Sequence, residues 1–392
     1  MYSFDEVIDR TETNSMKWAG ARGRLTPAQL VADPLPMWIA DMDFRVPRPI
    51  RAALAKEVKF GVFGYTQVSD GYIEAVLEWQ AKRFGWSPRS EWLVPAVGVV
   101  NALNMAVQAF SDPGDYVMVQ PPVYIHFHHD VLINGRRLLE VPLTSTADGY
   151  EFDPDKFEAA IRPGTKLFIL CNPHNPTGNV WTREELLQMG EICRRHNIIV
   201  VSDEIHQDFV FDHDKKHIPF ASLDPELADS CIVCTSPSKT FNTAGLQCAN
   251  ILIPNERLRT AFIAQSERCG VKLLNNLGPV ACEAAYRHCA PWVDAMLDYV
   301  AENQRHFAAR VRELDLPLRV MPTGSLYLAW IDCRALGLSP SELHDQMIRR
   351  ARLWLDPGSK FGSAGEGFMR INLACPRSTV DEALNRLANA SF

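Results

Sequence analysis

Short apolar runs alternate with amphipathic stretches through the middle of the chain, which predicts strands alternating with helices. The stretch at 182–197 is typical of a helix, because Thr182 is followed by Glu184 and Glu185 in the manner of a capping box. Alternation of this kind predicts an α/β fold built on a mostly parallel sheet. We expect strands at 115–120, 166–171, 198–203, 231–236 and 248–253.

The pattern changes after about residue 255. A long helical stretch at 292–314 leads into MPTGSLYLAW, a segment punctuated by proline and glycine. This change predicts a smaller α+β domain at the C-terminal end. We therefore expect an N-terminal segment (1–48) that packs on the small domain, a large domain (49–285) and the small domain itself (286–392).

Composition narrows the class of protein. The chain has 392 residues, of which 47% are hydrophobic, enough for a substantial core. Its 40 basic and 47 acidic residues give a net charge of −7, whereas a nucleic-acid partner normally requires a basic face. No apolar run approaches the roughly 20 residues that cross a bilayer, so no membrane partner is expected. Because the N-terminus has no signal-peptide pattern, we predict a cytoplasmic protein.

Ten cysteines in such a chain favour reduced thiols over a disulfide framework. Cys231 and Cys234 form a C-x-x-C pair, but residues three apart on a strand face opposite sides, so both are predicted to be buried core residues. His126, His128 and His129 lie close together without a cysteine or carboxylate cluster at ligand spacing. The sequence therefore predicts no metal site.

Three polar motifs follow three of the predicted strands. They are NPHNPTG (172–178), DEIH (203–206) and SPSKTFN (236–242). Each alone has a simpler interpretation, as a turn, a helix cap or a surface lysine. In open α/β sheets, however, ligands bind beyond the carboxyl ends of strands, so the three motifs are expected to meet in one crevice.

The residue types in these motifs suit pyridoxal 5'-phosphate (PLP). The cofactor aldehyde needs a lysine amine, and Lys239 is the candidate for the Schiff base. PLP is an electron sink while its pyridine nitrogen stays protonated, which calls for a carboxylate such as Asp203. Asn175 is suited to donate to the 3'-oxygen of the ring. We predict that Lys239 binds PLP covalently and that the substrate is an amino acid, a small-molecule partner.

The cofactor phosphate needs hydroxyl and backbone N–H donors, and the first turn of a helix supplies the latter. Ser236 and Ser238 offer hydroxyl groups. Gly98, Val99 and Val100 open a helical stretch and offer N–H groups.

Further segments narrow the resemblance to one branch of a family. With the three motifs above, the chain resembles the fold-type I PLP-dependent enzymes of the class I/II aminotransferase superfamily, and more narrowly the MalY/PatB branch of cystathionine β-lyases and cysteine C–S lyases. The resemblance spans residues 4–390 and implies the PLP-dependent transferase fold type I, with a seven-stranded sheet in the large domain and a homodimer with shared active sites. It is carried by FDEVIDRTETNSMKW (4–18), MWIADMDF (37–44), FGYTQVSDGY (63–72), DEIHQDFVF (203–211), SKTFNTAGLQCANI (238–251) and RINLACPR (370–377).

The resemblance also implies roles for single residues around the cofactor. Lys239 would move the Cα proton, in addition to holding PLP. His206 occupies the position where many aminotransferases place a tyrosine for the 3'-oxygen. Tyr124 would stack on the cofactor ring, although a core tyrosine is the alternative. Tyr65 would reach the phosphate of the neighbouring subunit.

On the substrate side, the resemblance implies that Arg370 binds the α-carboxylate with its planar guanidinium; a structural ion pair is the alternative. Ala40 would line the carboxylate end, and Asn175 would also face the substrate. One position departs from the wider superfamily. Gln247 stands where many aminotransferases carry a phosphate-binding arginine, a departure shared by the C–S lyase branch.

The resemblance favours α,β-elimination as the reaction. An S-substituted L-cysteine such as L-cystathionine would give a thiol (homocysteine), pyruvate and ammonia, a step of sulfur amino acid metabolism. An aminotransferase is the first alternative, since the same residues support it. A PLP-fold regulator is the second, but the branch motif begins at Phe4 and leaves no room for a DNA-binding region.

Overall fold

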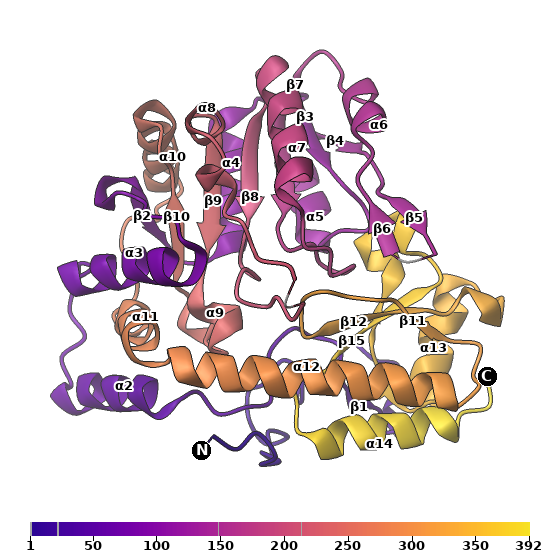
Figure 1. Ribbon diagram of the computed structural model, residues 1–392. Helices are drawn as coiled ribbons and strands as arrows, with labels where there is room; N and C mark the ends of the chain where they lie inside the picture. Colours follow the sequence, from indigo (N-terminus) through magenta and orange to yellow (C-terminus); the bar gives the residue numbers. More distant parts are fainter. Residues whose placement is uncertain (1, 22, 148, 213) are drawn as a thin grey trace.

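The computed structural model describes residues 2–21, 23–147, 149–212 and 214–392. A seven-stranded sheet lies at its centre (Figure 1). In chain order its strands are β2 (Leu93–Ala96), β3 (Tyr116–Val119), β4 (Arg137–Glu140), β7 (Thr165–Cys171), β8 (Ile199–Asp203), β9 (Cys231–Thr235) and β10 (Ala249–Leu252). They are ordered β2-β10-β9-β8-β7-β3-β4 across the sheet.

Five strands run parallel, from β9 to β4, while β10 is antiparallel to both of its neighbours. The predicted α/β fold with a mostly parallel sheet is confirmed, and each of the five expected strands is present. The outer strands β2 and β4 were not expected. Both are short, contain proline or charged residues and are only partly buried, so they lack the continuous apolar run that marks a central strand.

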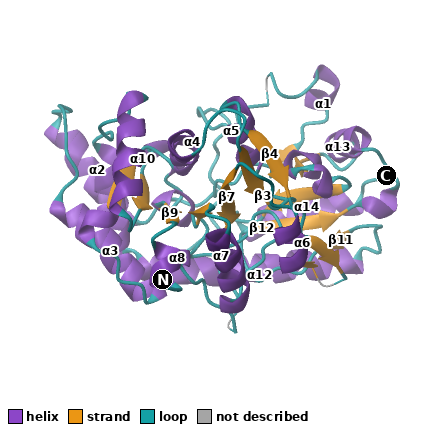
Figure 2. Cartoon of the chain, turned by 90° about the horizontal axis from the view of Figure 1, so that it is seen from above, coloured by secondary structure: helices purple, strands orange, loops and turns teal. Residues whose placement is uncertain are grey.

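Helices cover both faces of this sheet (Figure 2). Successive residues of a strand point to opposite faces, and the core divides accordingly. Cys231 packs in one cluster with α7 and α8, and Cys234 packs in the other with α4, α5 and α10, which confirms that the C-x-x-C pair is buried core. The helices around the sheet are α2 (Arg48–Phe60), α3 (Asp70–Phe84), α4 (Val99–Phe110), α5 (Ile125–Ile133), α6 (Pro154–Ala159), α7 (Arg183–Arg195), α8 (Pro225–Ala228), α9 (Pro237–Thr240), α10 (Glu256–Arg268) and α11 (Leu277–His288).

Thr182 starts α7 as predicted, because its hydroxyl and the Glu185 carboxylate form a reciprocal capping box.

The long helix expected at 292–314 is α12 (Ala290–Glu313). It packs along a second sheet in the C-terminal part of the chain (Figure 1). That sheet has the order β11-β12-β15-β14 and consists of β11 (Arg319–Val320), β12 (Leu328–Asp332), β14 (Asp356–Pro357) and β15 (Phe368–Asn372).

The N-terminal segment is tied to this C-terminal part by a short ladder. In it β1 (Leu35–Pro36) pairs with β13 (Leu353–Trp354). The remaining elements are α1 (Pro27–Val31), α13 (Pro340–Arg349), α14 (Arg377–Ala388) and the hairpin of β5 (Thr144–Thr146) with β6 (Gly149–Glu151). The domain limits at 49 and 286 stay a prediction. Over the part of the chain that the structure describes, no helix is long and apolar enough to span a bilayer.

Candidate active site

The three polar motifs meet at the carboxyl ends of β7, β8 and β9, as predicted. A cavity of about 530 Å³ opens there. Every site residue predicted from the sequence lines it, except Tyr65. These residues are Ala40, Gly98, Val99, Val100, Tyr124, Asn175, Asp203, His206, Ser236, Ser238, Lys239 and Arg370.

Lys239 lies in the short helix α9, which begins directly after β9 and is capped by the Ser236 hydroxyl. Its Nζ donates a hydrogen bond of 2.9 Å to the carbonyl oxygen of Ala40. Burial, with the nearby Arg370 charge, lowers the pKa of Lys239 from 10.5 to about 8. At pH 7 about one-tenth of this amine is therefore unprotonated, the form that acts as a nucleophile.

Asp203 ends β8 and is 4% exposed. Its Oδ1 accepts a hydrogen bond of 3.1 Å from the Ile205 N–H. Burial raises the pKa of Asp203 to about 7, and Lys239 opposes that rise only in part. A buried carboxylate in this state is stabilised by a cation placed in the cavity, which is what a protonated pyridine nitrogen would supply.

Arg370 projects from β15, so the second sheet contributes to the cavity. Its guanidinium donates to Asn175 Oδ1 at 3.1 Å, to the Trp38 carbonyl at 3.2 Å and to Asp356 Oδ2 at 2.5 Å. The Nε atom is buried and has no partner among the described residues. Arg370 is thus both ion-paired and open to the cavity, so the two interpretations of this residue are compatible.

Two aromatic side chains, His206 and Tyr124, line the same cavity. His206 is 3% exposed, and burial, with the charges of Lys239 and Arg370, lowers its pKa well below the usual value, which keeps the imidazole neutral. Its Nδ1 is buried without a partner in the described part of the chain. Tyr124 directly precedes α5, and burial raises the pKa of its phenol. Both rings are uncharged hydrogen-bonding groups at the cavity wall.

The opposite end of the cavity is rich in N–H and hydroxyl groups. Val99 and Val100 form the first turn of α4, whose N–H groups have no partner within the helix. The Ser236 hydroxyl donates a hydrogen bond of 2.7 Å to the Cys248 carbonyl and accepts one from the Ser238 N–H, which caps α9. Its hydrogen is therefore used within the protein, whereas the Ser238 hydroxyl makes fewer hydrogen bonds. Gln247 lines the same end, at the position that carries arginine in many aminotransferases.

Tyr65 is the exception. It lies in the loop between α2 and α3 and is completely exposed in the single chain. The structure does not bring it to the other predicted residues of its own chain.

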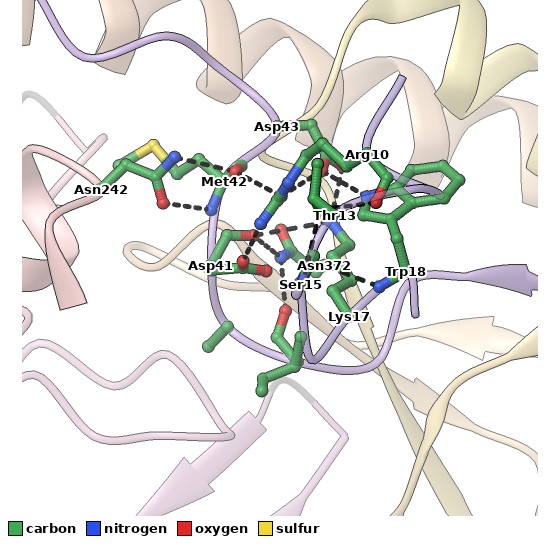
Figure 3. A network of polar contacts seen from close by, with 12 residues as sticks. Arg10, Thr13, Ser15, Lys17, Trp18, Asp41, Met42, Asp43, Asn242 and Asn372 are labelled. Carbon is green, nitrogen blue, oxygen red and sulfur yellow. Dashed lines mark hydrogen bonds and ion pairs between the residues drawn. The ribbon is translucent and has the colours of Figure 1, made fainter. Parts of the chain in front are cut away.

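A network of N-terminal residues supports the cavity from behind, and the sequence did not reveal it (Figure 3). Lys17 is 1% exposed and forms an ion pair of 2.6 Å with Asp43. Arg10 bridges Asp41 at 2.7 Å and Asp43 at 2.8 Å. The Trp18 indole donates to the same Asp43 at 2.9 Å. We call these five residues the N-terminal network.

Two asparagines also hold the loop 37–44 in place (Figure 3). Asn372 donates to the carbonyls of Ile39 and Asp41 at 2.7 and 2.6 Å. Asn242 exchanges hydrogen bonds with the backbone of Met42. The loop is thereby fixed so that the Ala40 carbonyl faces the Lys239 amine.

One expectation about the histidines near Tyr124 is wrong. No cysteine or carboxylate cluster is expected at ligand spacing from the sequence, but Asp130 lies on α5 with its Oδ1 3.4 Å from His126 Nδ1 and 3.2 Å from His129 Nδ1. The helix brings Asp130 beside the ring of His126, which is four residues earlier, while His129 is its immediate neighbour in the chain.

Comparison with known proteins gives the class to which this fold and site belong. The chain belongs to the aminotransferase class I and II family, whose profile matches residues 41–387.

Individual relatives agree with the narrower branch. The chain is 44% identical to cystathionine beta-lyase PatB of Bacillus subtilis (strain 168) over 390 residues, which cover 99% of each protein. It is 33% identical to protein MalY of Escherichia coli (strain K12), covering 100% of this chain and 99% of MalY. The structure of the PLP-bound C-S lyase from Staphylococcus hominis superposes with a TM-score of 0.91 at 32% identity, covering 99% of this chain and 97% of that one. The resemblance to the MalY/PatB branch and the type I fold is confirmed.

Proposed function

We propose that this protein is a PLP-dependent carbon–sulfur lyase of the cystathionine β-lyase type. It eliminates the thiol from an S-substituted L-cysteine such as L-cystathionine and leaves pyruvate and ammonia. The observation that carries this proposal is the placement of Lys239, Asp203 and Arg370 around one cavity in a chain whose relatives are cystathionine β-lyases and C–S lyases. Gln247 supports the same choice over an aminotransferase.

The cavity fits PLP in its charges and donors. Lys239 would hold the aldehyde carbon, Asp203 the pyridine nitrogen, and Asn175 and His206 the 3'-oxygen, with Tyr124 over the ring. The phosphate would take the α4 N–H groups and the Ser238 hydroxyl, with Ser236 supporting that side. The unpartnered Nδ1 of His206 and the raised pKa of Asp203 support this fit, since both call for a polar group in the cavity. When bound, PLP supplies the electron sink that makes the Cα–H bond acidic.

The protein supplies binding and proton transfer. Arg370 forks onto the substrate α-carboxylate, while Asn175 and the loop around Ala40 close the same end. This orientation directs the Cα–H bond towards the Nζ of Lys239, which removes the proton as a neutral amine. The Cβ–S bond then breaks, the sulfur leaves with the electron pair as a thiolate, and water hydrolyses the remaining three-carbon fragment to pyruvate and ammonia.

The proposal extends to a homodimer that shares its active sites through Tyr65. A single exposed tyrosine says little, but its neighbours are also exposed and apolar. Val58, Phe60, Val62 and Phe63 are each between 57% and 71% exposed. Val58 and Phe60 lie at the end of α2, and Val62 and Phe63 lie in the loop that joins α2 to α3 at the left edge of Figure 1. Such an apolar surface favours contact with a second chain.

A mixing experiment tests the shared sites. Tyr65→Ala and Lys239→Ala chains are each expected to be inactive alone. Hybrid dimers would regain one complete site, so an equal mixture after subunit exchange should show about one quarter of the parent activity. Zero recovered activity in a mixture proven to contain hybrids would exclude a shared site.

Substrate turnover tests the reaction itself. The purified holoenzyme is incubated with L-cystathionine or S-ethyl-L-cysteine, and pyruvate and free thiol are measured together. Equal amounts of both products are expected, with none from Lys239→Ala, while the exposed-lysine variant Lys82→Ala matches the parent. Keto-acid formation that depends on an added keto-acid acceptor, without pyruvate, would establish an aminotransferase instead.

A cytoplasmic setting remains part of the proposal. All ten cysteines are free thiols, nine of them buried, which supports a reducing environment.

A further inference from the structure

His126, His129 and Asp130 form a cluster beside the active-site cavity that the proposed reaction does not use. They occupy positions i, i+3 and i+4 of α5 and therefore share one face of that helix. Their donor atoms all lie within 4.8 Å of one another. His126 also lines the cavity, with its ring 5.2 Å from that of Tyr124.

The distances in this cluster suit a metal ion better than hydrogen bonds. Asp130 Oδ1 lies 3.4 Å from His126 Nδ1 and 3.2 Å from His129 Nδ1. A good N–H···O hydrogen bond is closer to about 2.9 Å. Two ligands of a tetrahedral Zn²⁺ ion, each about 2.0–2.1 Å from the metal, are separated by roughly 3.4 Å. The two distances to Asp130 Oδ1 are already close to that ligand spacing.

The negative charge of Asp130 also favours a bound cation. The Asp130 side chain is 1% exposed, and its Oδ2 is buried with no hydrogen-bond partner among the described residues. Within that part of the chain no lysine or arginine forms an ion pair with it, only the two histidines. A buried carboxylate in this situation is stabilised by a cation.

We propose that His126, His129 and Asp130 bind a divalent transition-metal ion of the Zn²⁺ type, with a fourth position left for water. Zn²⁺ and similar ions bind readily to two imidazoles and one carboxylate, whereas Mg²⁺ and Ca²⁺ prefer oxygen ligands. His129 faces solvent, with its side chain 55% exposed, so an ion can enter from outside the cavity.

Metal stoichiometry tests this site independently of catalysis. The holoenzyme is prepared without a histidine tag and in a Cys269→Ser background, because Cys269 is the exposed thiol. After chelation and dialysis against ZnCl2, we expect one tightly held Zn²⁺ per chain. His129→Ala should weaken binding roughly tenfold or more. Co²⁺ should give visible d–d absorption, at longer wavelengths than the cofactor band, that is lost in the same variant.

His196→Ala is the matched control. His196 is an exposed histidine 2.9 Å from Glu158, but Arg195 already neutralises that carboxylate. Its removal should leave the zinc content unchanged. Asp130→Asn serves as a second ligand variant, with its melting temperature measured because the residue is buried. A parent enzyme that binds no zinc, or a His129→Ala variant that binds as well as the parent, would overturn the proposal.

A second, independent observation concerns the outer part of the active-site cavity and rests on the proposed function. Among the described lining residues, Asp356 and Lys360 are the carboxylate and ammonium not assigned to the cofactor or to the α-carboxylate. They pair with each other at 2.9 Å, four residues apart. Lys360 Nζ also lies 5.7 Å from the centre of the Trp38 ring, and the adjoining wall is apolar, including Met16 and Ile125.

We infer that Lys360, with Asp356, recognises the distal amino-acid group of a substrate such as L-cystathionine. That group carries one carboxylate and one ammonium, which complement the ammonium of Lys360 and the carboxylate of Asp356, whose Oδ1 also accepts from Lys360 and whose Oδ2 accepts from Arg370. An S-alkyl cysteine has no distal charges and would contact only the apolar wall. Lys360 is therefore a residue that determines specificity between these two substrate classes.

The ratio of kcat/KM for L-cystathionine to that for S-ethyl-L-cysteine tests this inference. Lys360→Met keeps the aliphatic stem and removes the charge, so the ratio should fall about tenfold, the effect of one hydrogen bond to a charged group. Lys82→Met, which breaks an exposed pair with the same four-residue spacing, should leave it unchanged. An unchanged ratio in Lys360→Met overturns the inference, whether both values fall together or neither falls. If the parent releases pyruvate from neither substrate, the proposed function fails as well.

Discussion

The two sides of the active-site cavity are built in different ways. On the cofactor side, Asn175, Asp203 and Lys239 follow the ends of neighbouring strands, so the hydrogen-bond ladder of the sheet sets their positions. On the substrate side, Ala40 belongs to the irregular loop 37–44, and Arg370 comes from the second sheet. Two backbone hydrogen bonds of 2.9 Å join the loop to the end of β15, from the Asn372 N–H to the Met37 carbonyl and from the Asp43 N–H to the Ala374 carbonyl, but in the described part of the chain the loop forms no strand of the second sheet.

Side-chain contacts replace the ladder on the substrate side. Asn372 and Asn242 bind loop carbonyls, and the N-terminal network anchors Asp41 and Asp43 behind them (Figure 3). A sheet distributes its stability over many equivalent hydrogen bonds, whereas this loop depends on a few buried polar groups. We therefore expect single substitutions on the cofactor side to change PLP binding, and single substitutions on the substrate side to change substrate affinity.

The largest effect is expected at Lys239 on the cofactor side. Lys239→Ala removes the amine that takes the Cα proton, and turnover should fall about 10²–10⁴-fold or below detection. The visible absorption of the bound cofactor should disappear. The melting temperature should change little, because the Lys239 amine is partly desolvated and has no carboxylate ion pair that the substitution would break. A variant that keeps its visible band would contradict the assignment.

Lys17→Met should have the next largest effect, on the substrate side. It leaves the buried Asp43 carboxylate with Arg10 and Trp18 as its remaining partners, so the free energy of unfolding should fall by about 3 kcal/mol in urea denaturation. Because the loop 37–44 loosens, KM should rise while the PLP absorption persists. Lys82→Met, an exposed pair, should change stability by no more than about 0.5 kcal/mol. Equal losses in the two variants would contradict a structural role for the network.

Asn372→Leu sharpens the comparison at a single point. It removes the two hydrogen bonds that the Asn372 amide donates to the Ile39 and Asp41 carbonyls, so the free energy of unfolding should fall by about 1–3 kcal/mol. Each oxygen keeps one other donor, the Asp41 N–H at 3.0 Å and the Lys17 Nζ at 3.5 Å respectively. We expect a raised KM with an unchanged affinity for PLP, measured by cofactor titration of the apoenzyme. Weakened PLP binding with unaltered KM would mean that the two sides are not separable.

The same contrast explains what the sequence could predict. Asp203 and Lys239 were predictable because a polar residue at the end of an apolar strand, or in the short turn of helix that follows it, lies at the edge of the sheet. The contacts of Lys17 with Asp43 and of Asn372 with Asp41 join irregular segments far apart in the chain, and no periodic pattern encodes such pairings. The N-terminal motifs marked the branch without revealing this role. Asp356 and Asp130 were not predicted for a related reason. Asp356 pairs with Arg370 on the adjoining strand, and Asp130 lies beside His126, one helical turn earlier.

The smallest effect is a shift in pH dependence that couples the two sides through charge. With its pKa lowered from 10.5 to about 8, the Lys239 amine is about one-tenth neutral at pH 7, compared with roughly one part in 3,000 for an ordinary lysine. The rate at which the apoenzyme captures PLP should therefore rise with pH and level off above about pH 8. The Arg370 charge contributes to this lowered pKa, so Arg370→Gln should move the midpoint upward and slow capture at pH 7, while Arg370→Lys should largely keep it. A midpoint that stays fixed in Arg370→Gln would show that burial alone lowers the pKa of Lys239, and that the substrate-side guanidinium does not tune the cofactor-side amine.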